Sequence, residues 1–286
     1  MLVNMKEMLG EARKGAYAVG MFDVSDLEMI RAVTEEAEAL NAPVILGALW
    51  PDLEGGRLEY WALLARKAAE KVRVPVCLHL DHALELGQIA AAAEAGFTSV
   101  MLDASASPFG ENVRLSAEVV RLVRGKGITV EAELGHVGNG WVGSGEGAAA
   151  PDALTEPGSV REFLEKTRVD ALAVSIGTAH GVYIKAPRLD IPRLREIAEA
   201  ASGVPLVLHG GSGTPADQLA EAIRNGITKV NIYSELLTAW NTAWAEELKK
   251  QPHMAVWPAV LRKKPDAAMR EVIRQKIRFF GSAGRA

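Results

Sequence analysis

The sequence predicts an α/β protein of the (βα)8 barrel (TIM barrel) class, folded as a single domain over residues 1–286. Short runs rich in β-branched residues recur along the chain, and helical segments fill the gaps between them. Most runs are continuously apolar, as expected for parallel strands that are buried on both faces. The eight expected strands cover 16–22, 43–49, 74–81, 98–103, 129–134, 171–177, 205–210 and 229–234.

Helices are expected between these strands and after the last one. Ser25 and Glu28 have the spacing of a capping box at the start of the first helix. Gly96 and Gly125 stand where glycines end helices. A doubly wound sheet is the competing arrangement, but it would not usually supply eight regular repeats. The expected helices cover 25–41, 57–71, 84–95, 112–124, 160–167, 192–201, 215–225 and 236–250, with an additional C-terminal helix at 266–278.

The composition argues against nucleic acid and membranes as partners. Hydrophobic residues make up 49% of the 286 residues, the formal net charge is −4, and the chain has no long basic run. No apolar stretch is long enough to cross a bilayer, and the first residues lack the plan of a signal peptide. The one cysteine, Cys77, lies in an apolar run and is interpreted as a core residue. We therefore expect a cytoplasmic protein.

Three histidines follow buried strands and are the strongest functional signal. His82, His180 and His209 come after the third, sixth and seventh expected strands. Catalytic groups of (βα)8 barrels lie at the C-terminal ends of the strands, so these imidazoles are expected to converge. Three imidazoles can form a catalytic zinc site with a fourth position open for water or substrate. Another divalent metal in place of zinc, and an additional monovalent cation, stay open.

Carboxylates at the same strand ends surround the predicted metal site. Asp81 directly precedes His82, while Asp103 and Glu133 end the fourth and fifth strands. Asp103 and Glu133 are predicted to orient the imidazoles or to hold a second metal. Salt bridges inside the barrel are an equally open interpretation of these two residues.

A phosphate site is predicted beside the histidines. In (βα)8 enzymes a phosphate often binds the loops after strands 7 and 8. Glycines follow the seventh strand here, and a helix begins directly after the eighth. Backbone N–H groups, hydroxyls and a helix N-terminus together would hold a dianion. The expected substrate is therefore a small phosphorylated molecule, and its predicted contacts are Gly210, Gly211, Ser212, Asn231, Ile232, Tyr233 and Ser234.

Several ordered motifs resemble the class II, zinc-dependent ketose-bisphosphate aldolases, the family of fructose- and tagatose-bisphosphate aldolases. The resemblance covers nearly the whole chain. It implies a lyase of carbohydrate metabolism that reversibly cleaves a phosphorylated ketose to dihydroxyacetone phosphate and an aldehyde. It also implies a homo-oligomer, either a dimer or a tetramer. The motifs are HLDH (79–82), MLDAS, EAELG, GTAHG (177–181), LVLHGGSG (206–213), KVNIYSEL (229–236) and the ending FGSAGRA.

The resemblance also implies a role for each matching residue. His82, His180 and His209 would hold zinc, and Asp81 would be the acid/base that serves the hydroxyl at the bond being made or broken. Glu133 corresponds to the family's acidic residue near the metal. The residues implied to bind dihydroxyacetone phosphate are Gly181, Gly210 to Ser212 and Asn231 to Ser234.

One departure from the family concerns a second catalytic residue. The family usually places a glutamate in a mobile loop soon after its E-L-G segment, where it exchanges a carbon-bound proton. Trp141 and Val142 stand near that place here, and Glu146 is the nearest substitute. The glycines of this stretch predict a flexible lid, so Glu146 is the candidate for the proton exchange.

Three further departures concern the substrate pocket. Asp23 stands where asparagine is common, Leu49 where serine or threonine is usual, and Tyr233 where a small or acidic residue is common. Such replacements should change what the pocket accepts. For a second substrate phosphate, Arg278 and Arg285 are the only arginines that we can suggest.

Two other functions stay open at this point. A non-catalytic sugar-phosphate-binding or partner subunit is favoured only by the altered lid glutamate. A metal-dependent hydrolase on the same barrel would prefer a His-x-His on the first strand and an aspartate ending the eighth. This chain instead has Met21, Phe22 and Asp23 on the first strand and Asn231 on the eighth.

Overall fold

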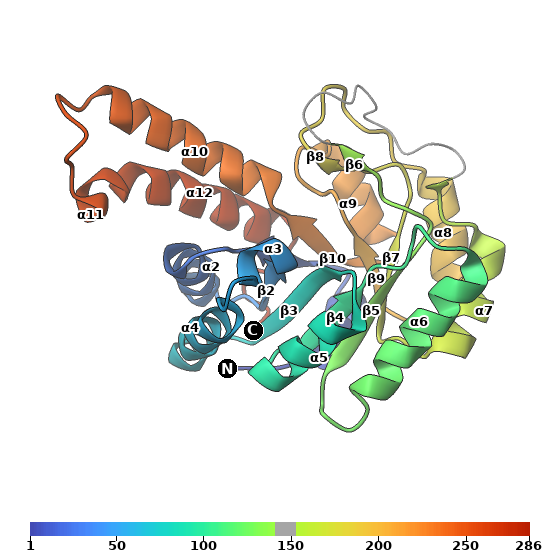
Figure 1. Ribbon diagram of the computed structural model, residues 1–286. Helices are drawn as coiled ribbons and strands as arrows, with labels where there is room; N and C mark the ends of the chain where they lie inside the picture. The colour runs from blue at the N-terminus through green and yellow to red at the C-terminus, as the bar shows by residue number, and fades with distance from the viewer. Residues whose placement is uncertain (141–152) are drawn as a thin grey trace.

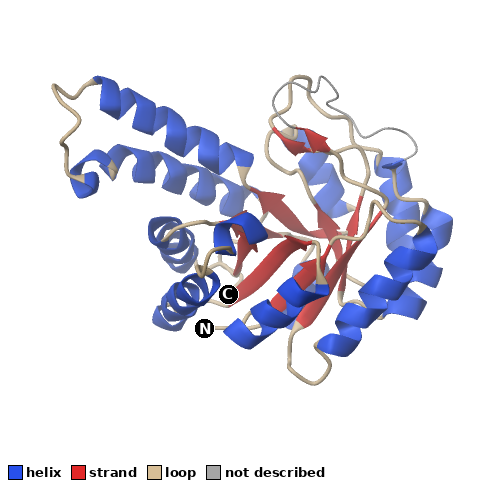
Figure 2. Ribbon diagram, viewed as in Figure 1, coloured by secondary structure: helices blue, strands red, loops and turns tan. Residues whose placement is uncertain are grey.

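The computed structural model describes residues 1–140 and 153–286, and within them eight parallel strands close into a barrel surrounded by helices (Figures 1 and 2). The order around the barrel is β1-β10-β9-β7-β5-β4-β3-β2. The predicted (βα)8 fold is therefore confirmed. The barrel strands are β1 (Val19–Asp23), β2 (Val44–Leu49), β3 (Val76–Ala83), β4 (Ser99–Leu102), β5 (Thr129–Leu134), β7 (Ala171–Val174), β9 (Leu206–Leu208) and β10 (Ile227–Ile232).

The predicted helices are present, the short helices α3 and α11 were not predicted, and one predicted cap needs correction. Asp26, not Ser25, caps α2, because its side chain accepts a hydrogen bond from the N–H of Met29 at 2.7 Å. The described helices are α1 (Met5–Lys14), α2 (Leu27–Ala39), α3 (Trp50–Leu53), α4 (Leu58–Lys71), α5 (Leu86–Ala95), α6 (Phe109–Leu122), α7 (Pro157–Thr167), α8 (Ile191–Ala200), α9 (Ala216–Arg224), α10 (Ser234–Lys249), α11 (Pro258–Leu261) and α12 (Lys263–Phe279).

Helix α1 was not expected from the sequence, and it closes the N-terminal end of the barrel. Met5 and Leu9 of this helix are buried in one apolar cluster with Met21, Ile45 and Cys77 of the strands. The last three side chains alternate with residues that face the surrounding helices, so they point into the barrel. Cys77 is fully buried, which confirms its interpretation as a core residue.

Helices α10 and α12 pack together into an arm that projects from the barrel, with α11 at its tip (Figure 1). The chain after α12 then returns to the opposite end from the strand C-termini. The N–H of Gly284 donates to the carbonyl of Leu40, and the guanidinium of Arg285 lies 5.4 Å from the ring centroid of Tyr17. Tyr17 precedes β1, so Arg285 cannot serve a second phosphate at the mouth of the barrel.

The interior of the barrel changes character along its axis. Its lower half, next to α1, holds the apolar cluster described above. Its upper half, towards the C-terminal ends of the strands, is polar. The fully or almost fully buried side chains there are His79, Asp81, Glu131, Glu133, His209, Lys229 and Asn231. No helix among the described residues is long and apolar enough to span a membrane.

Candidate metal centre and active site

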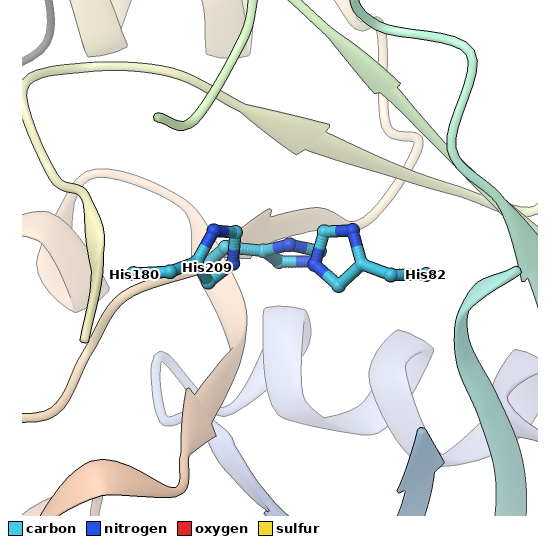
Figure 3. Close-up of side chains that lie close together, drawn as sticks. All are labelled: His82, His180 and His209. Atoms are coloured by element: carbon cyan, nitrogen blue, oxygen red, sulfur yellow. The ribbon is translucent and has the colours of Figure 1, made fainter. Parts of the chain in front are cut away.

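The three predicted histidines meet at the upper end of the barrel. Nitrogen atoms of His82, His180 and His209 all lie within 4.8 Å of one another. The ring centroid of His82 is 4.7 Å from that of His180 and 4.6 Å from that of His209. Figure 3 shows the three side chains converging, with His82 opposite His180. Residues more than a hundred positions apart in the sequence are thus brought to one point.

The ring nitrogens in this cluster are suited to a metal ion. Among the described residues, Nε2 of His82, Nδ1 of His209 and both ring nitrogens of His180 are buried without a hydrogen-bond partner. Leaving a buried polar atom unpaired costs about 1–3 kcal/mol. Three imidazole nitrogens facing one point are also the ligand set of a catalytic zinc ion with one open position. The donors present therefore fit zinc.

A local irregularity in β3 places Asp81 and His82 on the same side. In a regular strand, neighbouring side chains point to opposite faces. The register between β3 and β4 shifts between Leu80 and Ala83, and His82 has a φ of 47°, in the left-handed region. Bulges of this kind re-aim a side chain near an active site. As a result both Asp81 and His82 line the same cavity.

His180 is held by a short sheet above the barrel. This sheet pairs β6 (Asn139–Gly140) with β8 (His180–Gly181), and the N–H of His180 donates to the carbonyl of Gly138 at 2.8 Å. Tyr183 connects this segment to the loop after β9, since its hydroxyl donates to the carbonyl of Gly210 at 2.9 Å. The loops that carry His180 and follow His209 are thereby fixed relative to one another.

Asp103 fixes the orientation of His82. Its Oδ2 lies 2.8 Å from Nδ1 of His82, and its Oδ1 accepts a hydrogen bond from the hydroxyl of Ser105 at 2.6 Å. Burial alone would raise the pKa of Asp103, but the hydrogen bonds from His82 and Ser105 hold this pKa well below its ordinary value. An ionised Asp103 keeps the proton of His82 on Nδ1, which leaves Nε2 free for a metal.

Glu131 and Lys229 support His209 from below, and the sequence did not single them out. Oε1 of Glu131 lies 2.8 Å from Nε2 of His209, and Oε2 lies 2.9 Å from Nζ of Lys229. All three side chains are fully buried. Burial raises the pKa of Glu131, but Lys229 and His209 outweigh burial and lower it to about 2. Their positions in the sequence could have indicated this role. Glu131 lies two residues before Glu133, and Lys229 lies two residues before Asn231, so both side chains face the inside of the barrel.

Glu133 lies beside the histidine cluster, and its Oε2 makes no hydrogen bond. Its Oε1 accepts the N–H of Val137 at 2.8 Å, and its Oε2 is 3.4 Å from Nδ1 of His209. Burial raises the pKa of Glu133 to about 8, with Asp103 adding to the effect. Glu133, Asp103 and His82 also have ligand atoms close enough for a metal, so the second-metal prediction stays a prediction.

Asp81 is a buried carboxylate at the edge of the histidine cluster. Nδ2 of Asn231 donates to its Oδ2 at 3.3 Å, and Nε2 of His79 lies 3.5 Å from its Oδ1. Burial would raise the pKa of Asp81, but His82 and His79 hold it well below its ordinary value. Asp81 is therefore ionised at neutral pH, and such a group can accept a proton.

A cavity of about 660 Å³ opens above the histidines and includes most of the predicted phosphate contacts. Two of the predicted residues, Gly211 and Ile232, do not line it. The side chain of Ile232 is fully buried in the outer apolar core, and the N–H of Gly211 already donates to the carbonyl of Asn231 at 3.1 Å. The predicted residues that do line the cavity are Gly181, Gly210, Ser212, Asn231, Tyr233 and Ser234.

The phosphate end of the cavity is built around Ser212 and the start of α10. The hydroxyl oxygen of Ser212 accepts the N–H of Tyr233 at 3.1 Å and the N–H of Glu235 at 3.4 Å. Gly210 adopts a φ of 65°, and a Cβ there would collide with the backbone of Ala179. Only glycine therefore lets this loop pass so close to the segment that carries His180.

The other end of the cavity is lined by the residues that depart from the family. Asp23, Leu49 and Tyr233 all lie there. Asp23 is 5% exposed, and burial, reinforced by Asp81, raises its pKa well above the ordinary value. Burial also raises the pKa of Tyr233.

Arg278 and the residues of the predicted lid are not among the described residues that line this cavity. Arg278 lines a second cavity of about 880 Å³ next to α12, which adjoins the first cavity at Gly181, Ser212 and Ser234. Glu146, Trp141 and Val142 lie outside the described residues. The predicted role of Glu146 therefore stays a prediction.

Comparison with known proteins identifies relatives along the full length of the chain. The family described as "Fructose-bisphosphate aldolase class-II" matches residues 3–285. A fructose-bisphosphate aldolase of Geobacillus stearothermophilus is 40% identical over 293 residues, covering 100% of this chain and 99% of that protein. A 6-phospho-5-dehydro-2-deoxy-D-gluconate aldolase of Bacillus licheniformis is 37% identical over 287 residues, covering 99% and 96%. The crystal structure of the YdjI aldolase from Escherichia coli K12 superimposes with a TM-score of 0.88 at 35% identity, covering 100% of both chains.

Proposed function

The chain belongs to the class-II fructose-bisphosphate aldolase family, whose members are carbon–carbon lyases, and on that premise we propose that it is a zinc-dependent enzyme. The proposed reaction is the reversible cleavage of a phosphorylated ketose to dihydroxyacetone phosphate and an aldehyde. One observation carries the proposal. Three buried imidazoles with unpartnered nitrogens face one point, and the ionised carboxylate of Asp81 lines the same cavity.

Each group of the site has a proposed part in this reaction. His82, His180 and His209 would hold zinc, which when bound supplies a Lewis acid for the ketone carbonyl. Asp81 would take the proton from the hydroxyl at the bond being cleaved and return it to the aldehyde oxygen during condensation. The hydrogen bond from Asn231 holds Asp81 in place for this transfer.

Dihydroxyacetone phosphate would bind with its phosphate at the start of α10. Ser212 and Ser234 line this end of the cavity and α10 begins at Ser234, so a dianion placed there would meet two hydroxyl groups and the N-terminus of a helix. Gly181, Gly210 and Ser234 complete the wall of the cavity at this end. Gly211 and Ile232 would contribute through the shape of the backbone, since the Ile232 side chain is in the core. We assign the exchange of the carbon-bound proton to Glu146.

The aldehyde half of the substrate is the open part of the proposal. Fructose or tagatose bisphosphate is the default ketose. The relatives are named for different substrates, and 6-phospho-5-dehydro-2-deoxy-D-gluconate carries a single phosphate. The family therefore includes proteins named for bisphosphates and proteins named for monophosphates.

A coupled assay for dihydroxyacetone phosphate tests the proposed reaction. Metal-loaded protein is incubated with a panel of phosphorylated ketoses, with and without a chelator. We expect release from at least one ketose and loss of release after chelation. Release that a chelator does not affect would refute the metal-dependent mechanism. Zinc and phosphate binding without cleavage of any ketose would support a non-catalytic binding subunit instead.

The ligand assignment has its own test with a matched control. His180→Ala should reduce bound zinc well below one ion per chain, because a ligand with two unpartnered nitrogens is removed. His253→Ala removes an exposed histidine near the tip of the arm and should retain the zinc of the unmodified protein. Elemental analysis after dialysis measures both. Equal zinc content in the two variants would contradict the assignment.

We also propose that copies of the chain associate through the arm. Met254, Trp257 and Val260 near α11 are large apolar side chains that are mostly exposed. Such a group of residues is typical of a protein–protein contact. Light scattering should show a smaller particle for Trp257→Lys than for the unmodified chain. The control Tyr60→Lys, which changes an equally exposed residue of α4, should leave the particle size unchanged.

A further inference from the structure

Among the residues that the structure describes, the end of the cavity that would receive the aldehyde contains carboxyl groups but no basic side chain. Asp23 and Asp81 line this cavity, and none of its described lining residues is lysine or arginine. The positive charge of a metal at the histidines would be directed to the ketone carbonyl. The described part of the far end therefore offers no cation to a second phosphate.

Asp23 is held at this end by the packing of β1 and β2. It lies in register with Gly47, and a Cβ at Gly47 would collide with Oδ1 of Asp23 and with the sulfur of Met21. Glycine at this position thus makes room for the carboxylate. Oδ1 of Asp23 is buried without a hydrogen-bond partner, and the residue also lines the cavity. Leu49, in register with Asp81, adds an apolar wall beside it.

The nearby basic side chains are committed elsewhere. Lys276 and Arg278 line the adjoining cavity beyond Ser212, where Lys276 pairs with Glu235 at 2.5 Å. On the other side, the guanidinium of Arg57 donates to the carbonyls of Asp52 and Pro51 at 3.1 and 2.9 Å. Neither group is among the residues that line the substrate cavity.

We propose that the aldehyde half of the substrate is an uncharged hydroxyaldehyde, so that the ketose carries one phosphate, at its dihydroxyacetone end. This inference rests on the proposed aldolase function and names the substrate class of the same site. A phosphate dianion placed beside the buried carboxyl group of Asp23 and the ionised carboxylate of Asp81 would lose its hydration without gaining a cation. A hydroxyl group would instead form a hydrogen bond with the carboxyl group of Asp23, which lines the cavity. A site built to pair a hydroxyl discriminates strongly against groups that cannot donate to it.

Condensation with a set of aldehydes tests the inference on the zinc-loaded full chain. Dihydroxyacetone phosphate is offered with glyceraldehyde, glyceraldehyde 3-phosphate or malonate semialdehyde. We expect kcat/KM for glyceraldehyde to exceed that for the two anionic aldehydes by about a hundredfold. An anionic aldehyde that reacts equally well or better would overturn the inference.

A variant of Asp23 with a matched control locates the cause of the discrimination. Asp23→Asn keeps the size of the side chain but replaces a carboxyl oxygen with an amide N–H donor, and it should raise the ratio of kcat/KM for glyceraldehyde 3-phosphate over glyceraldehyde by about tenfold. Asp52→Asn makes the same replacement at a half-buried residue outside the cavity lining and should change that ratio much less. An unchanged ratio in Asp23→Asn, or equal changes in both variants, would overturn the inference.

A second variant keeps the test independent of the folding of Asp23→Asn. Leu49→Arg adds a cation at the same wall, and it should raise the same ratio. A lower or unchanged ratio in Leu49→Arg would count against the inference.

The outcomes separate this inference from the proposed function. If only phosphorylated aldehydes condense and bisphosphates are cleaved, the aldolase function stands and the inference fails. If no aldehyde condenses and neither monophosphates nor bisphosphates are cleaved, the aldolase function itself fails.

Discussion

The two halves of the barrel interior are made by the same strands but have opposite chemistry. In the lower half, Met21, Ile45 and Cys77 pack with helix α1 into an apolar cluster. In the upper half, the same strands carry Asp23, Gly47 and Asp81, which lie two to four residues further along. The interior therefore changes from apolar to polar within about one layer of side chains along the barrel axis.

The lower half of the barrel interior contributes mainly stability, and the upper half carries the chemistry. Burying apolar side chains stabilises the fold, whereas burying charges is costly unless they are paired. The upper half keeps its charges by pairing them, as in the contacts of Glu131 with Lys229 and His209. Nitrogens of His82, His180 and His209 are among the atoms that stay unpaired, and their partner would be the metal. Substitutions in the lower half should therefore lower the stability of the fold without affecting catalysis.

The largest expected effect is on catalysis, in the upper half. Asp81→Asn removes the proposed proton acceptor and should lower kcat by about a thousandfold, within the range for general acid–base groups. The bound zinc should stay at one ion per chain, because Asp81 is not one of the proposed ligands. Loss of zinc together with activity would show that Asp81 is a ligand or a structural support.

The next effect is on stability, also in the upper half. Lys229→Met leaves the buried carboxylate of Glu131 without its cation, and we expect unfolding to become easier by about 3–5 kcal/mol. Denaturant unfolding of the metal-free protein measures this. The double variant Lys229→Met/Glu131→Gln removes both charges and should recover part of the loss. A double variant less stable than Lys229→Met would contradict the account of this pair.

A pH effect is expected from the lower half. Burial raises the pKa of Cys77 from 9.0 to about 12 in the folded protein. The unfolded chain releases this proton at a lower pH than the folded chain does, so the thiol should destabilise the protein as pH rises from 9 towards 12. The expected slope from this group is about 1.4 kcal/mol per pH unit.

The comparison of Cys77→Ala with the unmodified chain isolates this contribution. The variant should be less stable near neutral pH because it leaves a gap, but its stability should fall less steeply above pH 9. Parallel stability curves for the two proteins would contradict the assignment of this slope to Cys77.

The smallest expected effect is a simple loss of packing in the lower half. Ile45→Val removes one methylene from a fully buried side chain and should cost about 1 kcal/mol. Zinc content and kcat should be unchanged, because Ile45 contacts the apolar cluster rather than the site. A change in zinc affinity would show that the two halves are not independent.

Much of the fold could be predicted from the sequence because strand runs and helices follow their local patterns. The barrel strands lie within a few residues of their predicted positions. Helix α1 was missed although Met5, Met8, Leu9 and Ala12 have helical spacing, because a helix before the first strand is not part of the repeating pattern.

The proposed metal ligands could be predicted from the sequence, but the residues that orient them could not. The histidines were found because each follows a strand. That Asp81 and His82 face the same cavity depends on the bulge in β3, which no local pattern announced. Lys229 and Glu131 looked like ordinary strand residues, since only closure of the barrel brings them together. Ile232 was expected at the site, but β10 turns its side chain outwards into the core.

The most direct test of the central claim is a zinc titration of the metal-free protein. Bound zinc and the release of dihydroxyacetone phosphate from a phosphorylated ketose are measured on the same samples. If His82, His180 and His209 form the catalytic metal site, activity will rise in proportion to bound zinc and reach its plateau at one ion per chain. Full activity in the metal-free protein, or saturation with zinc without any activity, would contradict the claim.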